Sequence, residues 1–191
     1  MIEVRIHGRG GQGNVVAAYL LATAAFEEGR YGQAFPAFGA ERRGAPVTAF
    51  VRIADAPIRR RCEVRQPAFL IIQDEALLHV SGVLDGLLPG GGILVNSGRP
   101  SDQLSAEHGH DMLGLPASAL ATEILGRPMP NTALLAAFLT LSGLLPCEAL
   151  VKALAERFRG KILEKNTALI ERASSMVTPG LWQEVSHAAS A

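Results

Sequence analysis

The first 29 residues carry the clearest pattern of hydrophobic and polar positions in the chain. Ile2, Val4 and Ile6 alternate with polar residues, which predicts a β-strand with one buried face. The run 14–26 is rich in alanine and leucine, contains no proline or glycine and stops before Gly29, so we expect a helix there. The chain therefore begins with a strand that leads into a helix through a glycine-rich turn.

Beyond this unit, strands and helices are predicted in alternation, and helices alone follow. Apolar or β-branched runs predict strands at 32–35, 47–53, 69–72, 93–97 and 112–115. Helices are expected at 76–88, 118–125, 131–143 (capped by Asn131 and Thr132), 146–158 and 161–176. Segment 98–111 is expected to be an exposed connection with room for a turn of helix. Because no helix separates 32–35 from 47–53, some antiparallel pairing is implied.

This order predicts an α/β fold, a three-layer α/β/α sandwich with a mixed, mostly parallel sheet and a helical C-terminal part. We find no internal repeat and no linker. The whole chain, 1–191, is therefore expected to form a single domain.

Composition limits the classes of partner. The formal net charge is zero, which argues against nucleic acid or an anionic membrane as the main partner. No run approaches the roughly 20 apolar residues of a membrane span, and the chain starts directly with a strand, so a cytoplasmic protein is expected. Hydrophobic residues make up 48% and charged residues 19%, which indicates surface that other subunits cover and self-association of the isolated chain.

The glycine turn is the first candidate site. Gly8, Gly10 and Gly13 satisfy the pattern G-x-G-x-x-G between a strand and a helix, where free backbone N–H groups and the helix dipole favour an anion. A dinucleotide site also needs an acidic residue about 20 positions further on, at the next strand, and 32–35 offers none. A phosphate-binding turn and a turn that only lets the helix pack closely both remain open.

The remaining candidates are a charged run and isolated histidines and cysteines. Glu41, Arg42 and Arg43 lie between apolar residues, so this run could clamp a phosphate or carboxylate, with Glu41 orienting an arginine, or form a solvated turn. His7 is expected to be hydrogen-bonded to backbone. Cys62 and Cys147 are expected to be buried free thiols, because two isolated cysteines cannot ligate an iron–sulfur cluster, and no metal-ligand spacing is found.

Two motifs in this order resemble a known family. Residues 8–13, Gly-Arg-Gly-Gly-Gln-Gly, resemble the GxGGQG turn of the gamma subunit, or gamma domain, of 2-oxoacid:ferredoxin (flavodoxin) oxidoreductases. Residues 35–46 are similar to that family's second signature, an aromatic-Gly-Pro-Glu-x-Arg-Gly-Gly loop, with Ala40 and Ala45 as departures. The Arg-Arg-Gly-Ala-Pro form is similar to that of pyruvate-type members. Agreement continues at 71–74, 91–97, Asn131 and Asn166.

The resemblance implies a subunit that is inactive alone and has no catalytic or metal-binding residue of its own. The complex would use thiamine diphosphate, magnesium, iron–sulfur clusters and coenzyme A, with alpha, beta and delta subunits as partners and ferredoxin or flavodoxin as electron acceptor. The gamma chain would pack beside the active site and help to bind coenzyme A. The cofactor-binding residues implied are Gly8, Gly10, Gly11, Gln12, Gly13, Glu41, Arg42 and Arg43.

Two alternatives remain beside this expectation. One is a freestanding dinucleotide-binding protein that uses the glycine turn, and the other is a purely structural scaffold subunit. The basic cluster at 59–61 with Arg65 is expected to be either a salt-bridged subunit interface or a landing patch for the phosphoadenosine of coenzyme A.

Overall fold

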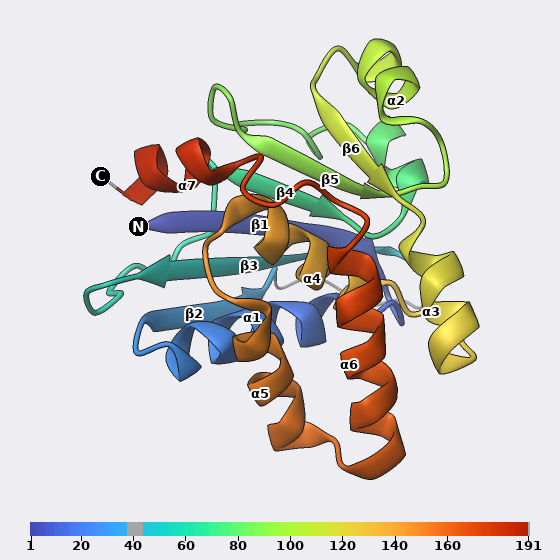
Figure 1. Cartoon of the computed structure of the whole chain (residues 1–191). Helices are drawn as coiled ribbons and strands as arrows, with labels where there is room; N and C mark the ends of the chain where they lie inside the picture. The colour runs from blue at the N-terminus through green and yellow to red at the C-terminus, as the bar shows by residue number, and fades with distance from the viewer. Residues whose placement is uncertain (38–43, 191) are drawn as a thin grey trace.

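A mixed β-sheet forms the middle layer of the computed structural model, which describes residues 1–37 and 44–190 (Figure 1). Within these residues the sheet has six strands in the order β2-β3-β1-β4-β5-β6. Their bounds are β1 Ile2–Arg9, β2 Tyr31–Pro36, β3 Pro46–Ala54, β4 Phe69–Ile72, β5 Gly92–Asn96 and β6 Met112–Leu115. Strands β1, β4, β5 and β6 are parallel, whereas β3 pairs antiparallel with both β1 and β2.

Helices cover both faces of the sheet. One face carries α1 (Asn14–Glu27), α3 (Ala117–Leu125), α4 (Asn131–Ser142), α5 (Cys147–Arg157) and α6 (Gly160–Ser174). The other face carries η1 (Glu75–His79) and α2 (Ser101–His108), and α7 (Gln183–Ser190) lies beside the N-terminus. The predicted fold class, a three-layer sandwich with a mostly parallel sheet and a helical C-terminal part, is confirmed.

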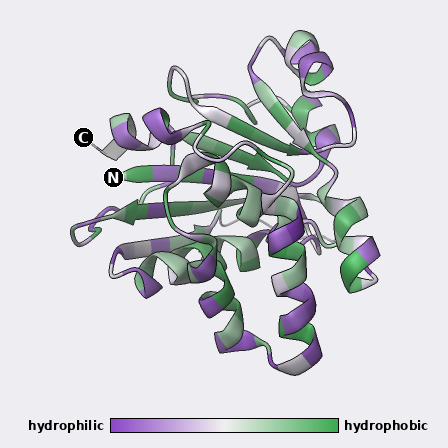
Figure 2. Cartoon of the chain, in the orientation of Figure 1, coloured by the Kyte–Doolittle hydropathy of each residue, from purple (hydrophilic) through white to green (hydrophobic). Residues whose placement is uncertain are grey.

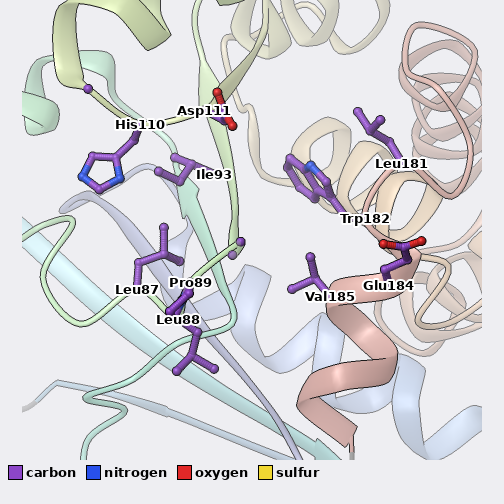
Figure 3. A pocket seen from close by; sticks show the side chains of 13 residues that line it. Leu87, Leu88, Pro89, Ile93, His110, Asp111, Leu181, Trp182, Glu184 and Val185 are labelled. Carbon is purple, nitrogen blue, oxygen red and sulfur yellow. The ribbon is translucent and has the colours of Figure 1, made fainter.

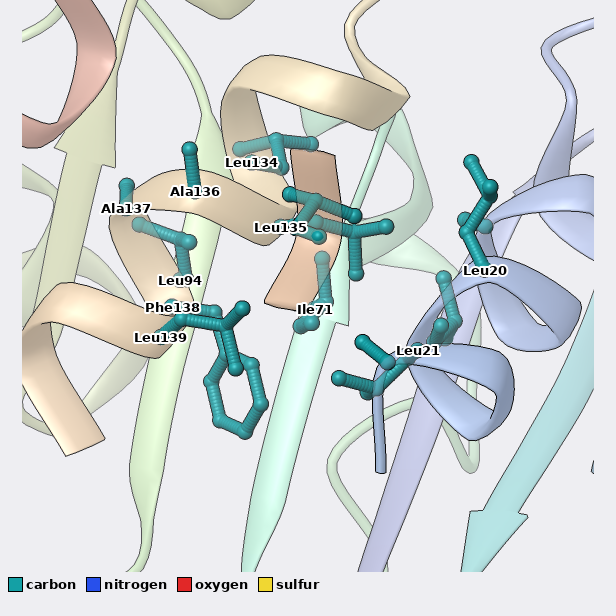
Figure 4. Close-up of a cluster of buried hydrophobic side chains, with 14 of the residues drawn as sticks. Leu20, Leu21, Ile71, Leu94, Leu134, Leu135, Ala136, Ala137, Phe138 and Leu139 are labelled. Atoms are coloured by element: carbon teal, nitrogen blue, oxygen red, sulfur yellow. The ribbon is translucent and has the colours of Figure 1, made fainter. Parts of the chain in front are cut away.

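Helix α4 is the centre of the larger core. Its residues 133–139 are all at most 1% exposed, so this helix is hydrophobic on every side and is enclosed between the sheet and other helices. Figure 4 shows Leu135 and Phe138 facing side chains of α1, β4 and β5. The Phe138 ring meets the Phe69 ring edge-on, with 5.1 Å between centroids. In contrast, α6 mixes hydrophilic and hydrophobic residues along its length (Figure 2).

The prediction of a helix at 76–88 is wrong. The structure has only the short 3₁₀ helix η1 there, capped by the Asp74 carboxylate, and then a series of turns. Gly82 and Gly86 adopt left-handed backbone conformations, and a Cβ on Gly86 would collide with the carbonyl oxygen of Arg65. The chain turns because it must follow the sheet closely, and leucines that suggested a helix pack onto the sheet from these turns.

Other segments also differ from the predictions. The sequence allowed a turn of helix in the connection 98–111, and the structure has the longer helix α2 of 8 residues, on which only Leu104 is buried. Helix α7 was not predicted. Helix α4 begins at Asn131 itself with Pro130 as N-cap and no side-chain cap, so the predicted cap is wrong. Cys62 is exposed, contrary to expectation, although both cysteines are free.

We expect Phe138→Ala to lower the free energy of unfolding by about 3–5 kcal/mol, because it leaves a cavity at the centre of the core. Phe26→Ala is the matched control: this side chain on α1 is 75% exposed, so its loss should cost little. Urea unfolding of the two variants measures both values. Similar losses from the two substitutions would contradict the central place of α4.

Candidate functional site

The carboxyl end of β1 lies at a reversal of the sheet's connections. Strands β1 and β4 are parallel neighbours, but β1 is followed by α1 on one face and β4 by η1 on the other. In open α/β sheets such a switch point leaves a crevice outside the carboxyl ends of the strands, which is where ligands bind. The glycine turn between β1 and α1 occupies this place, so we take it as the candidate site.

The backbone of the turn requires glycine for two different reasons. Gly11 and Gly13 have φ values of 97° and 78°, which side chains rarely adopt. At Gly8 the reason is space, since a Cβ would lie 2.6 Å from Oδ1 of Asn14. Gly13 is the N-cap of α1, and no side chain of residues 1–37 or 44–190 caps this helix. The amides of the first turn of α1 are therefore left for a ligand or water, at the positive end of the helix dipole.

An ion pair and the side chain of a glutamine stabilise the conformation of the turn. Arg9 Nε donates to Oδ2 of Asp74 at 2.6 Å, which joins the end of β1 to the residues after β4. The Gln12 side chain accepts from the Arg9 amide at 2.7 Å and reaches the same Asp74 oxygen at 3.5 Å. Gln12 thus stabilises the turn from within, a structural task beside the ligand contact that the sequence predicts for it.

The C-terminal end of the second signature segment, at Gly44 and Ala45, is hydrogen-bonded to the glycine turn. The Gly10 amide donates to Ala45 O at 3.0 Å, the Gly44 amide donates to Gly10 O at 3.3 Å, and Arg9 Nη1 donates to Gly44 O at 3.2 Å. The predicted site residues Glu41, Arg42 and Arg43 lie outside the described residues. The chain that leads away from them is tied to the turn by backbone hydrogen bonds.

Three buried carboxamides surround the turn, and none was predicted as a site residue. Asn14 is 3% exposed and donates to carbonyls of β1 and β3, yet its Oδ1 has no partner among the described residues. Gln73, which follows β4, is fully buried, and neither atom of its amide group is bonded within those residues. Asn131 at the start of α4 is 7% exposed, and its Nδ2 lies 2.8 Å from a Cβ built on Gly13.

Such unpaired buried groups cost free energy unless a ligand or an ordered water satisfies them. The signal in the sequence was a polar residue directly after the apolar run of β4 for Gln73, and a carboxamide at the first position of a helix for Asn14 and Asn131. Gln73 and Asn131 also belong to the positions where the family resemblance holds.

A second polar cluster lies on the opposite face of the sheet. Arg5 Nε donates to His7 Nε2 at 3.1 Å, so the imidazole proton is on Nδ1, which faces Thr48 Oγ1 at 3.3 Å. The partners of His7 are thus side chains and not the backbone we expected. Burial first, and the charge of Arg5 second, lower the pKa of His7 from 6.5 to about 3. The histidine is neutral and part of a fixed network.

The basic cluster at 59–61 is far from the glycine turn. The fully buried Arg52 holds the segment that follows β3, because its guanidinium donates to the carbonyls of Arg60 and Cys62. The same guanidinium forms an ion pair with Glu3 at 2.6 Å. Glu3 stands at the start of β1, whereas the glycine turn follows its end. The structure therefore does not bring this cluster and the turn into one site.

A cavity of about 630 Å³ also lies away from the turn (Figure 3). Trp182 and Val185 face Leu87 and Ile93 across it, near the start of β5. Its charged lining residues, Asp111 and Glu184, are both acidic, which disfavours an anionic ligand. We therefore do not assign this cavity to a phosphate group.

Within the described residues, no group of three or more histidine, cysteine, aspartate or glutamate side chains is arranged to hold a metal ion. In the same residues, none of the helices has the length and apolar character that a membrane crossing demands.

The chain is similar to known proteins over most of its length. Residues 3–176 match the family described as pyruvate ferredoxin/flavodoxin oxidoreductase. The pyruvate synthase subunit PorC of Methanothermobacter marburgensis is 50% identical over 167 residues, 87% of this chain and 92% of that protein. The common subunit gamma of the pyruvate/ketoisovalerate oxidoreductases of Thermococcus kodakarensis is 46% identical, covering 91% and 95%.

Solved structures agree with these relatives. The pyruvate oxidoreductase subunit PORC of Thermotoga maritima has a TM-score of 0.81 and 33% identity, covering 91% of this chain and 95% of that one. The 2-oxoglutarate:ferredoxin oxidoreductase of Magnetococcus marinus, solved with 2-oxoglutarate, coenzyme A and succinyl-CoA, shares the fold at a TM-score of 0.74 and 18% identity; the match covers 98% of this chain and 31% of that one.

The fold and the glycine turn thus define an α/β chain of the gamma type. The chain belongs to the pyruvate ferredoxin/flavodoxin oxidoreductase family, as the two sequence motifs predicted.

Gly13→Ala should destabilise the chain more than Gly126→Ala. Both glycines have the same left-handed backbone, with φ of 78° and 77°, so both substitutions carry about 1–2 kcal/mol of strain. Only at Gly13 does the new methyl group also meet Asn131, because a Cβ on Gly126 has open space around it. Thermal unfolding of both variants measures the difference. Equal shifts would mean that α4 does not pack against the turn.

His7 should make the chain less stable in mild acid. Its folded pKa lies below the unfolded value, so the unfolded chain binds more protons between pH 6.5 and 3 and stability falls as the pH falls through this window. The expected loss at pH 5 is about 2 kcal/mol relative to neutral pH. Urea unfolding from pH 5 to 8 measures it. His7→Gln should flatten the profile, and the exposed His187→Gln should not; an unchanged slope in His7→Gln would refute the assignment.

Proposed function

We propose that this chain is the gamma subunit of a thiamine-diphosphate-dependent 2-oxoacid:ferredoxin oxidoreductase. In that complex it packs beside the active site and binds coenzyme A during oxidative decarboxylation to acyl-CoA. The observation that carries the proposal is the start of α1 at the switch point, which no described side chain caps, with the Asn131 amide beside Gly13. Backbone amides at a helix start are suited to the pyrophosphate of coenzyme A.

Pyruvate is the substrate that the names of the relatives favour. The Methanothermobacter relative is a pyruvate synthase subunit, and the Thermococcus relative is a gamma subunit common to pyruvate and ketoisovalerate oxidoreductases. A gamma chain that is common to two oxidoreductases cannot be the subunit that selects the acid. We therefore assign the choice of 2-oxoacid to other subunits and the coenzyme A contact to this one.

The residues of this chain do not suit the cofactors that carry the electrons. Cys62 is exposed and Cys147 is hydrogen-bonded near Thr140 and Ser174, so the two thiols cannot supply the four ligands of a cluster. We assign the iron–sulfur clusters, thiamine diphosphate and magnesium to alpha, beta and delta-type partners, and ferredoxin or flavodoxin to the complex as electron acceptor. The freestanding dinucleotide-binding protein gains no support from the relatives, and the scaffold alternative is tested next.

Arg42→Ala should weaken the use of coenzyme A by the reconstituted complex. The sequence places Arg42 in the signature loop whose far end, Gly44 and Ala45, is bonded to the glycine turn. The loss of a charge-assisted contact costs about 1.5–3 kcal/mol, or roughly a ten- to hundredfold higher KM for coenzyme A. Steady-state 2-oxoacid oxidation at varied coenzyme A measures this, and Arg42→Lys should recover only part because an ammonium cannot donate as a fork.

The thiamine half-reaction, measured without coenzyme A, is the internal control and should stay intact in Arg42→Ala. Copurification of the subunits separates binding from assembly. If the complex falls apart while the remaining assembled fraction keeps its KM for coenzyme A, Arg42 holds subunits together and the scaffold alternative is correct.

A further inference from the structure

A small, largely enclosed cavity of about 160 Å³ lies beside the glycine turn on the helical side of the sheet. Its walls are apolar: Leu20 comes from α1, Leu125 from the end of α3, and Leu154 and Phe158 from the end of α5. A cavity with these apolar side chains suits a heteroaromatic base better than a phosphate or a carboxylate.

One polar end of this cavity has a free donor. Thr132 and Asn166 line it but are already engaged: the Thr132 hydroxyl donates to Asn166 Oδ1 at 3.2 Å, and Asn166 Nδ2 donates to a carbonyl of its own helix. Asn131 accepts from the Thr132 amide through Oδ1, while its Nδ2 bonds to none of the described residues. This nine-tenths buried amide is the polar group left for a ligand.

The cavity adjoins the glycine turn. Val16, in the first turn of α1, lines both this cavity and the hollow of about 260 Å³ formed by the glycines. Leu20 in the cavity lies one helical turn further on, about 6 Å along the axis. A Cβ on Gly13 would approach Asn131 to 2.8 Å, so the free amide stands between the two hollows. A single ligand could therefore occupy both.

Two arginines border the cavity without acidic partners. Arg127 and Arg157 both line it and are exposed, and neither forms an ion pair within residues 1–37 and 44–190. Arg30 and Arg99, which are half-buried, are in contrast paired with carboxylates. Two unpaired guanidinium groups at the mouth of an apolar cavity suit a phosphate attached next to the group inside it.

We propose that this cavity receives the adenine of coenzyme A and that Arg127 and Arg157 bind its 3′-phosphate. The inference rests on the proposed function, in which the glycine turn holds the pyrophosphate of the same molecule. The 3′-phosphate is on the ribose that carries adenine, so a base in the cavity brings this phosphate to the two arginines. Asn131 stands between the base and the pyrophosphate and can donate to either.

The reactive end of the ligand supports this orientation. The thiol of coenzyme A must leave this chain to reach thiamine diphosphate on another subunit. An enclosed cavity among helices α1, α3, α4, α5 and α6 would trap a thiol but is well suited to hold the end that takes no part in the reaction. The arrangement anchors the nucleotide and leaves the pantetheine arm free to extend from the turn.

The test compares coenzyme A with dephospho-coenzyme A, which lacks only the 3′-phosphate, in the reconstituted complex. Arg157→Ala and Arg127→Ala should each raise the KM for coenzyme A about tenfold and leave the KM for dephospho-coenzyme A unchanged. Arg172→Ala removes the same charge from an exposed site on α6 outside the cavity and should change neither value. Asn131→Asp keeps the acceptor for Thr132 but repels phosphate, so it should raise both KM values.

A measurement on the unaltered complex guards against variants that fail to assemble. Adenosine 3′,5′-bisphosphate should compete with coenzyme A more strongly than ADP does. Equal inhibition by the two nucleotides, or arginine variants that affect coenzyme A and dephospho-coenzyme A alike or not at all, would overturn the assignment. If Arg42→Ala still raises the KM for coenzyme A in that case, the proposed function stands and only the adenine site is rejected; if no gamma variant changes this KM, both fail.

Discussion

The side chain of Asn14 is the interaction on which the arrangement of this molecule depends. Its Nδ2 donates to the carbonyls of Ile6 and Val47 at 3.0 and 2.5 Å, so one amide ties the start of α1 to both β1 and β3. The helix can approach the strand so closely only because Gly8 has no side chain. The glycine turn is thereby compressed between strand and helix, and its amides face outward from the carboxyl edge of the sheet. Packing and ligand binding make the same demand on these glycines.

The two faces of strand β1 carry side chains of different chemistry. Its core face carries the aliphatic residues that α1 and α4 cover, and its other face carries Glu3, Arg5 and His7 in a row. Glu3 and His7 meet partners on β3, where the register places Arg52 opposite Glu3 and Thr48 opposite His7, whereas Arg5 donates to His7 and to the carbonyl of Val83. The buried charges on this face are satisfied by hydrogen bonds of fixed geometry, which orders the strand whose end supports the turn. The polar face stabilises the site from behind.

How much the sequence could predict follows from the range of the interactions involved. The alternation in β1, the buried run of β4 and the glycine turn are local patterns, and the fold class and the family followed from them. The helix at 76–88 failed because contacts with Arg5 and Arg65, far along the chain, hold that segment in turns. The roles of Gln73 and Asn131 were likewise out of reach, since their side chains matter only through neighbours that the fold brings to one edge. Helix α7 was missed because it is short and begins just after Trp182 anchors the chain.

The charge distribution of this chain differs from that of a protein that binds anions through a broad basic surface. The chain has no net charge, and the site that we propose would use backbone amides, carboxamides, Arg127 and Arg157 rather than a broad basic surface. Neutral donors of fixed direction select a ligand by shape and give it one orientation, whereas a diffuse positive field would attract any anion equally. In the function that we propose, the subunit presents one end of coenzyme A to a neighbour, a task that needs orientation more than raw affinity. A site built from a helix start, an enclosed apolar cavity and a few fixed donors meets that need.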